Sequence, residues 1–404
     1  MAPREHDVVL HGATGFVGRL TARHLAAQAG PAKVALSGRS RPKLEALRDE
    51  LGVDWPVLVT DSSEAAATAA LAASTTAVAT TVGPYLKHGL PLVRACAEAG
   101  THYADLTGEV LFVRRSADAA HERARETGAR IVHSVGFDSV PSDLGVLLLH
   151  ERVQADDEGT LQDTVYLLVS ARGGFSGGTV DSMRGMVDEV RNDRSLRAVL
   201  DDPYALSPDR FAEPYLGKEA DLLLPVRDRL LGRWVAPFVM APYNTRIVRR
   251  SNALLGHRYG PGFRYREVMG VGTSPFAPVL AGAVAAGTAG LAAGMLVGPT
   301  RALLDRVLPK PGGGPSEKTQ RGGHFRVEIH TRTTTGARYV ATVAAHGDPG
   351  YAATAVMLGQ SALCLGLDPL SSPGGVTTPA VAMGDRLADR LRDSGFELSV
   401  ARLA

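Results

Sequence analysis

The first part of the chain alternates short apolar runs with longer segments of helical periodicity. Short apolar runs are typical of strands that are buried on both faces of a parallel sheet. They lie at 8–10, 33–37, 56–60, 77–82, 102–106 and 129–134, and the intervening pattern predicts helices at 19–26, 42–51, 90–99 and 112–127. This alternation predicts an α/β fold over 1–150, with a doubly wound parallel sheet covered by helices.

The pattern changes after about residue 150, and a chain of 404 residues is too long for one ordinary core. Further strands are predicted at 164–169, 324–332, 338–346 and 396–400, and further helices at 180–190, 351–365 and 379–392. Apolar and polar residues alternate in 324–332 and 338–346, which predicts a hairpin. We predict a second, α+β domain at 151–350 for substrate binding or oligomerisation. The C-terminal helices of 351–404 are expected to return to the first domain.

One long apolar stretch interrupts the second domain, because 268–300 contains no charged residue. Prolines break its start, and 279–297 predicts a helix about long enough to cross a bilayer. Its residues are mostly Ala and Gly, which makes spanning marginal. Leu280, Val284 and Leu291 share one face of this helix. The apolar helix at 279–297 can therefore face a membrane surface, an acyl chain or the core of the second domain.

Composition and charge exclude several classes of partner. A net charge of +2 without a dense Lys/Arg run argues against nucleic acid. The two cysteines, Cys96 and Cys364, suit a reducing compartment, and no Cys or His spacing indicates a metal site. No apolar signal-peptide core precedes the first strand. We expect a cytoplasmic protein, with peripheral contact at the inner face of the plasma membrane as a possible addition.

Three glycines at a spacing of three follow the first apolar run. Gly12 permits a tight turn out of the strand, Gly15 lets a pyrophosphate approach the backbone, and Gly18 lets helix and strand pack closely. This is the strand–turn–helix opening of a Rossmann-type dinucleotide-binding domain, although a turn without ligand is the alternative. The expected cofactor contacts here are Gly12, Thr14, Gly15, Phe16, Val17 and Gly18.

The end of the second strand predicts which dinucleotide binds. An acidic residue usually holds the unphosphorylated ribose of NAD about 20 residues after the glycines. Here the chain reads Ser37-Gly38-Arg39 and contains no acid. Because a guanidinium binds a 2′-phosphate and a carboxylate repels it, Arg39 favours NADP(H) over NAD(H). A solvated surface arginine is the alternative reading of Arg39.

Two further strand ends complete the predicted site. Asp61 and Ser62 follow the third strand, where they are expected to cap the next helix and to border the adenine. The fourth strand ends in Val82-Gly83-Pro84, which should lie near the nicotinamide. Tyr85 and His88 are placed on the loop after it and are candidates for proton transfer or substrate positioning. Packing of Tyr85 against the cofactor is the alternative.

A family resemblance rests on five motifs considered together. They are Gly12-Ala-Thr-Gly-Phe-Val-Gly18, Ser37-Gly-Arg-Ser40, Val82-Gly-Pro-Tyr85, Tyr103-Ala-Asp-Leu-Thr-Gly-Glu109 and Gly136-Phe-Asp-Ser-Val-Pro-Ser-Asp143. The chain resembles the saccharopine dehydrogenase-like oxidoreductases, and within them the trans-acting enoyl reductases. The similarity is dense over 7–150 and looser beyond. The last motif is its most specific part.

The resemblance implies an NADP-binding domain and an NADPH-dependent reductase in envelope lipid biosynthesis. Its substrate would be a double bond in a polyketide or fatty acyl chain on the carrier protein of a separate synthase. Saccharopine itself fits poorly, because the chain lacks the Gly-x-Gly opening of the enzymes that handle it. No tyrosine has a lysine four residues later, which excludes a short-chain reductase mechanism. A C=N or C=O oxidoreductase, or a membrane-associated NADP(H)-binding protein without turnover, remains an alternative, as does a homo-oligomer.

Overall fold

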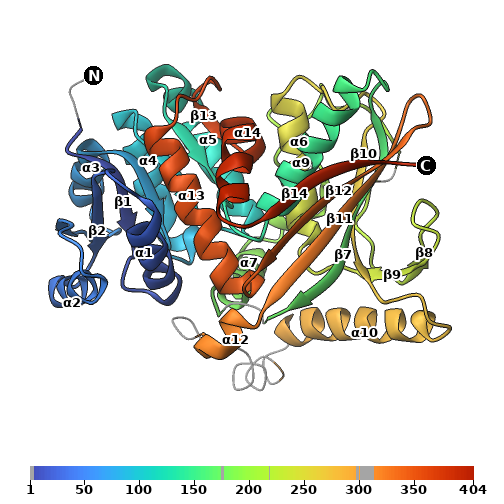
Figure 1. Cartoon of the computed structure of the whole chain (residues 1–404), viewed down its shortest axis with the longest axis horizontal. Coiled ribbons are helices and arrows are strands. Elements are labelled where there is room, and N and C mark those ends of the chain that lie inside the picture. Colours follow the sequence, from blue (N-terminus) through green and yellow to red (C-terminus); the bar gives the residue numbers. More distant parts are fainter. Residues whose placement is uncertain (1–3, 174–176, 218, 297–299, 301–313) are drawn as a thin grey trace.

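The computed structural model describes residues 4–173, 177–217, 219–296, 300 and 314–404, and its strands form two seven-stranded sheets (Figure 1). The first sheet has the order β13-β6-β5-β4-β1-β2-β3, and all its neighbouring strands run parallel. The predicted doubly wound parallel sheet is therefore confirmed. Its strands are β1 (His6–His11), β2 (Val34–Gly38), β3 (Val57–Val59), β4 (Thr75–Thr80), β5 (His102–Asp105), β6 (Arg130–Val132) and β13 (Gly375–Thr377).

The second sheet is mixed and has the order β14-β12-β11-β7-β10-β9-β8. Only β7 and β10 are paired in parallel, and the predicted hairpin is confirmed as β11 and β12. Its strands are β7 (Leu161–Arg172), β8 (Val226–Arg227), β9 (Trp234–Pro237), β10 (Arg264–Gly270), β11 (His324–Thr333), β12 (Arg338–His346) and β14 (Glu397–Leu403).

The predicted helices are present in the predicted order and extend beyond several predicted ends, whereas α9 and α12 were not predicted. Those of the first domain are α1 (Phe16–Gln28), α2 (Arg41–Leu51), α3 (Ala65–Ser74), α4 (Tyr85–Ala99) and α5 (Val110–Thr127). The others are α6 (Val140–Ala155), α7 (Gly177–Asn192), α8 (Leu196–Asp201), α9 (Ala241–Leu254), α10 (Ala277–Leu296), α12 (Glu317–Arg321), the π-helical turn Pro349–Ala353, α13 (Thr354–Leu367) and α14 (Pro379–Asp393).

The C-terminal segment divides between the two sheets. As predicted, α13 packs on the first sheet, where it contacts β1, β4 and β5. The expectation that all of 351–404 returns to the first domain is wrong, however, because β14 pairs with β12 at the edge of the second sheet. The predicted boundary at residue 150 also falls inside α6, which packs against β11 and β12. The chain therefore crosses between the two domains more than once.

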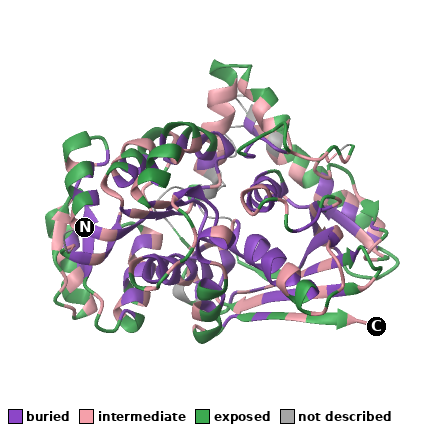
Figure 2. Ribbon diagram, turned by 90° about the horizontal axis from the view of Figure 1, so that it is seen from above, coloured by how far each residue is buried: buried purple, intermediate pink, exposed green. Residues whose placement is uncertain are grey.

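The main hydrophobic core runs through both domains. It joins residues of β1 and α13 on one side to residues of α6, β11 and β12 on the other. Figure 2 shows the buried residues gathered in the two sheets and in the helices between them. Asp143 links α6 to two other helices of this core. Its buried carboxyl accepts hydrogen bonds from the Ser251 hydroxyl on α9 and the Ala380 N–H on α14. Burial raises the pKa of Asp143 to about 7.

Two local predictions about the first domain are wrong. Helix α4 begins at Tyr85, so Tyr85 and His88 lie on its first turns and not on a loop. The cause lies far along the chain, because the Glu109 carboxylate accepts the N–H groups of Tyr85 and Leu86 and so caps the helix. Asp61 does not cap α3, since Glu64 stands at that position. Its carboxylate instead accepts both the N–H and the hydroxyl of Ser63.

Helix α10 confirms the predicted apolar helix, except for residue 297, which lies outside the described residues. It lies along the lower edge of the second domain in Figure 1, where it packs against β9 and α7. Among the residues that the structure describes, two helices, Ala277–Met295 and Pro349–Leu367, are long and apolar enough to cross a membrane, by length and composition alone. The second is mostly buried and serves as a core helix, whereas only 18% of the first is buried.

Candidate active site

The glycine turn between β1 and α1 has the close packing that the spacing predicts. Gly12 has a φ of +83°, in the left-handed region that favours glycine. A Cβ on Gly18 would lie 2.2 Å from the Gly12 carbonyl oxygen, so α1 approaches β1 too closely for any other residue. Gly15 is exposed at the N-terminus of α1. The turn therefore presents open backbone N–H groups to an anion.

The ends of the next strands gather the residues predicted for the adenosine end of a cofactor. Arg39 is exposed after β2 and, within the described residues, has no ion-pair partner. Hydrogen bonds from Ser63 lower the pKa of Asp61, and the charges of Arg39 and His88 lower it further. Arg39, Asp61 and His88 are therefore electrostatic neighbours. His88 lies at this end and does not line the cavity described next.

A buried histidine connects these strand ends. The two ring nitrogens of His11, at the end of β1, lie 3.0 Å from the Ser37 hydroxyl and 2.8 Å from the Ser62 hydroxyl. Burial lowers the pKa of His11 to about 4, so the ring is neutral at pH 7. Ser37 and Ser62, both predicted cofactor contacts, are buried with it. The two contacts of His11 link the end of β1 to the end of β2 and to the segment after β3.

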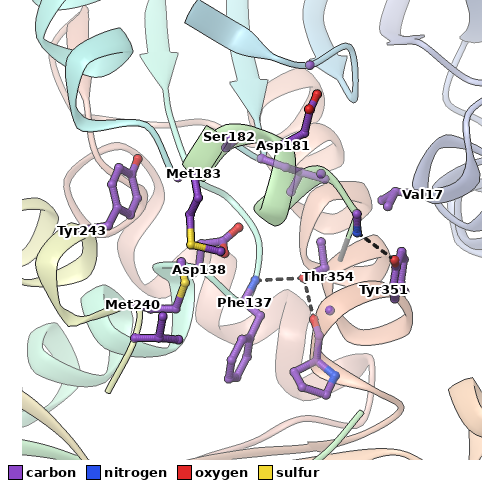
Figure 3. Close-up of a pocket in the computed structure, with 18 of the residues that line it drawn as sticks. Val17, Phe137, Asp138, Asp181, Ser182, Met183, Met240, Tyr243, Tyr351 and Thr354 are labelled. Atoms are coloured by element: carbon purple, nitrogen blue, oxygen red, sulfur yellow. Dashed lines mark hydrogen bonds between the residues drawn. The ribbon is translucent and has the colours of Figure 1, made fainter. Parts of the chain in front are cut away.

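A cavity of about 610 Å³ lies at the C-terminal edge of the first sheet, where it meets α7, α9 and the second sheet (Figure 3). Among the predicted cofactor residues, those that line it are Gly15, Phe16, Val17, Gly83 and Pro84. The side opposite the first sheet is mostly apolar and includes Met183, Met186, Leu200, Phe238, Met240 and Met269. The cavity therefore extends from the predicted nicotinamide position into an apolar chamber.

Tyr85, the first predicted proton donor, lines the cavity but uses its hydroxyl elsewhere. That hydroxyl donates to the Thr80 carbonyl and accepts the Leu106 N–H, each at 3.2 Å. The ring is buried and stacks on Phe112. Burial raises the pKa of Tyr85 well above its usual value. The Tyr85 hydroxyl is thus engaged within the protein. A catalytic role for Tyr85 or His88 stays a prediction without geometric support, and packing of Tyr85 against the cofactor stays a prediction as well.

Two cavity residues were not predicted as functional. Tyr243 of α9 reaches the first domain, where its hydroxyl is hydrogen-bonded to Ser134. Asp138 follows β6 and directs its carboxyl to the cavity, close to Met183 and Met240 in Figure 3. The sequence signal for Asp138 is its place in the motif at 136–143, the most specific of the five motifs that carry the family resemblance. Within the described residues, no group of three or more His, Cys, Asp or Glu side chains could hold a metal.

Comparison with known proteins identifies the family. Residues 8–132 match the saccharopine dehydrogenase NADP-binding domain. The chain is 50% identical to a trans-acting enoyl reductase of Mycobacterium bovis and 48% identical to one of Mycobacterium ulcerans, over 100% of this chain and 99% of each relative. The chain belongs to the trans-acting enoyl reductase family. Saccharopine dehydrogenase (L-Glu forming) from Saccharomyces cerevisiae shares the fold, with a TM-score of 0.53 and 13% identity over 98% of this chain and 99% of that one.

The family match makes NADP(H) the cofactor of this trans-acting enoyl reductase, and the residues present fit it. The turn at Gly12–Gly18 leaves no room for a Cβ at Gly18 and exposes the N-terminus of α1 to a diphosphate. Arg39 is an exposed guanidinium without an ion-pair partner among the described residues, at the position where a 2′-phosphate is expected. The individual contacts of these residues with the cofactor remain predictions.

Proposed function

We propose that the protein is an NADPH-dependent reductase of the enoyl double bond in a polyketide or fatty acyl chain. The observation that carries this proposal is the apolar chamber joined to the cofactor edge of the first sheet. Its walls include four methionines, which are flexible and suit a long chain without fixed shape. A polar metabolite would find few hydrogen-bonding partners there.

The chain's own residues would act mainly by positioning. Bound NADPH supplies the hydride for the β-carbon of the enoyl thioester. Gly83 and Pro84, which follow β4, and Phe16 at the start of α1 line the cavity together with the methionines. An acyl chain seated among the methionines would hold its double bond toward the cofactor end and exclude water from it.

The test is NADPH oxidation by the purified protein with a long-chain enoyl thioester. We expect oxidation with this substrate and none with the saturated thioester of equal length. Oxidation with a ketoacyl thioester alone would instead support a C=O reductase. Tight NADPH binding without oxidation of any thioester would support a binding protein without turnover.

We further propose that the acyl chain arrives on the carrier protein of a separate synthase, as the family's trans-acting designation suggests. A chain bound to a carrier must enter with its thioester last, and the apolar lining of the cavity suits the free end of such a chain. The expected result is faster NADPH oxidation with an enoyl group on its carrier protein than with the same group on a short thiol. Equal rates for the two forms would contradict this partner.

We also propose that α10 contacts the lipid bilayer at the cytoplasmic face of the plasma membrane. Phe276, Val279 and Leu280 are 76%, 72% and 51% exposed at the start of this helix. Leu224, before the neighbouring β8, is 71% exposed. Exposed apolar residues along one helix suit the surface of a bilayer.

We expect the double variant Val279→Glu/Leu280→Glu to bind vesicles of phosphatidylglycerol and phosphatidylcholine at least about 100-fold more weakly than the wild type, because each of the two buried apolar side chains contributes about 1.5–3 kcal/mol. Vesicle co-sedimentation measures this change. Val59→Glu is the matched control, since Val59 is 49% exposed on the edge strand β3 of the first sheet. Equal binding by the double variant and the wild type would show that α10 does not contact the bilayer.

A further inference from the structure

We propose that Asp138 is the acid that protonates the α-carbon during enoyl reduction. This inference deepens the proposed function and rests on it. Asp138 belongs to the motif at 136–143, the most specific of the five sequence motifs. Asp143 of the same motif is already hydrogen-bonded to Ser251 and Ala380. Asp138 does not share those partners, because it lies in the turn before α6 and lines the cavity.

The carboxyl of Asp138 is free to act on a ligand. Its only hydrogen-bond donor among the described residues is its own backbone N–H. Several of its neighbours are apolar, with Phe137 beside it in the chain and Met183 and Met240 near it in Figure 3. Burial, and then the negative charge of Asp105, raise its pKa to about 7. A cavity carboxyl with this pKa holds a proton at neutral pH and can release it.

The other acidic groups that line the cavity have other partners. The hydroxyls of Tyr85 and Tyr243 are bonded to the first domain, and that of Tyr351 accepts the Gly177 N–H at 3.1 Å. Burial raises the pKa of all three phenols. Asp181 is paired with Arg184 at 4.0 Å. Asp138 is therefore the cavity carboxyl that, in the described part of the chain, is neither paired with a cation nor hydrogen-bonded to another residue.

The proposed step balances in atoms and charge. Addition of hydride to the β-carbon moves the electron pair of the C=C bond to the α-carbon and the thioester oxygen. The O–H bond of Asp138 then breaks, a C–H bond forms at the α-carbon, and the carboxylate remains. NADPH is oxidised, the double bond is reduced, and Asp138 regains its proton from water after product release.

The titratable groups around Asp138 set the expected pH dependence. They are Asp105 at the end of β5, Glu109 before α5, Tyr85 on α4, Asp181 on α7 and Tyr243 on α9. Burial and the negative charge of Asp105 both favour the acid form of Asp138, which therefore persists to about pH 7. Because the acid form is the active one, kcat/KM should be flat below this pH and fall about tenfold per pH unit above it.

The test compares wild type with Asp138→Asn, which keeps the shape of the side chain and cannot donate an acidic proton. We expect kcat/KM to fall about 100-fold or more and the decline above pH 7 to disappear. In D₂O, the wild type should place deuterium on one face of the α-carbon, whereas the variant should place it on both. In the cofactor-free protein, carbon-13 NMR of labelled aspartates should show one carboxyl with a pKa near 7 that is absent from Asp138→Asn.

Asp157→Asn is the matched control, because Asp157 is exposed beyond the far end of α6 and its left-handed backbone tolerates asparagine. It should behave as the wild type in all three measurements. A wild type that does not oxidise NADPH with any enoyl thioester would overturn the proposed function. A wild type that turns over, with Asp138→Asn retaining its rate, pH profile and stereochemistry, would overturn only the role of Asp138.

Discussion

Replacing Gly18 by alanine should lower both the stability of the first domain and its affinity for NADPH. The added Cβ would lie 2.2 Å from the Gly12 carbonyl oxygen and 2.9 Å from backbone atoms of Ala13, which cannot rotate away as a side chain could. Helix α1 must then move off β1. We expect the free energy of unfolding to fall by about 1–3 kcal/mol, as for other overpacked sites. NADPH affinity should fall about tenfold or more, because the anion-binding N-terminus moves with the helix.

The matched control is Gly185→Ala, also in a helix. Gly185 lies in α7, and a Cβ there would meet nothing within 4 Å. This substitution should leave NADPH affinity unchanged and raise stability by up to about 1 kcal/mol, since alanine favours the helix. Chemical unfolding and calorimetric titration of both variants provide the comparison. Unchanged NADPH affinity in a folded Gly18→Ala variant would remove the glycine turn from the cofactor site.

Replacing Arg39 by alanine should weaken the binding of NADPH and leave the binding of NADH nearly unchanged. Charge-assisted hydrogen bonds contribute about 1.5–3 kcal/mol, so NADPH affinity should fall about 10- to 150-fold. NADH has no 2′-phosphate and should bind as before, within about twofold. The loss should also diminish at high salt, because Arg39 is exposed and its charge is screened. Titrations with both cofactors at two salt concentrations measure this effect.

Arg48→Ala is the control for Arg39. Arg48 lies in the last turn of α2 and is paired with Asp49 at 2.9 Å, so its charge is already engaged. Neither cofactor should bind differently to this variant. If Arg39→Ala weakens NADPH and NADH equally, Arg39 does not bind a 2′-phosphate, and the choice of cofactor must depend on another residue.

The sequence could predict the first sheet well because its signals are local. Buried parallel strands are continuous apolar runs, and the glycines of the β1–α1 turn mark a backbone geometry that other residues cannot adopt. The start of α4 could not be predicted, because its cap comes from Glu109, more than twenty residues later. The place of β14 depends on pairing with β12, a contact between distant segments. Such contacts leave no local periodicity.

The residues at the cofactor end of the cavity could be predicted from the sequence better than Asp138 and Tyr243, which line the cavity elsewhere. Gly15, Phe16 and Val17 line the cavity because they belong to one short turn whose geometry follows from its sequence. Asp138 and Tyr243 come from different domains and meet only in the folded chain. Within one motif, Asp138 faces the cavity whereas Asp143 is buried against Ser251. Both are aspartates near a helix start, so the sequence could not distinguish their environments.

Deuterium transfer from NADPH tests the central claim most directly. The purified protein is incubated with NADPH that carries deuterium at the transferred position and with a long-chain enoyl thioester, and the acyl product is analysed by mass spectrometry. Our account predicts a saturated thioester with one deuterium at the β-carbon. Recovery of the unsaturated thioester without deuterium, from protein that binds NADPH tightly, would contradict it.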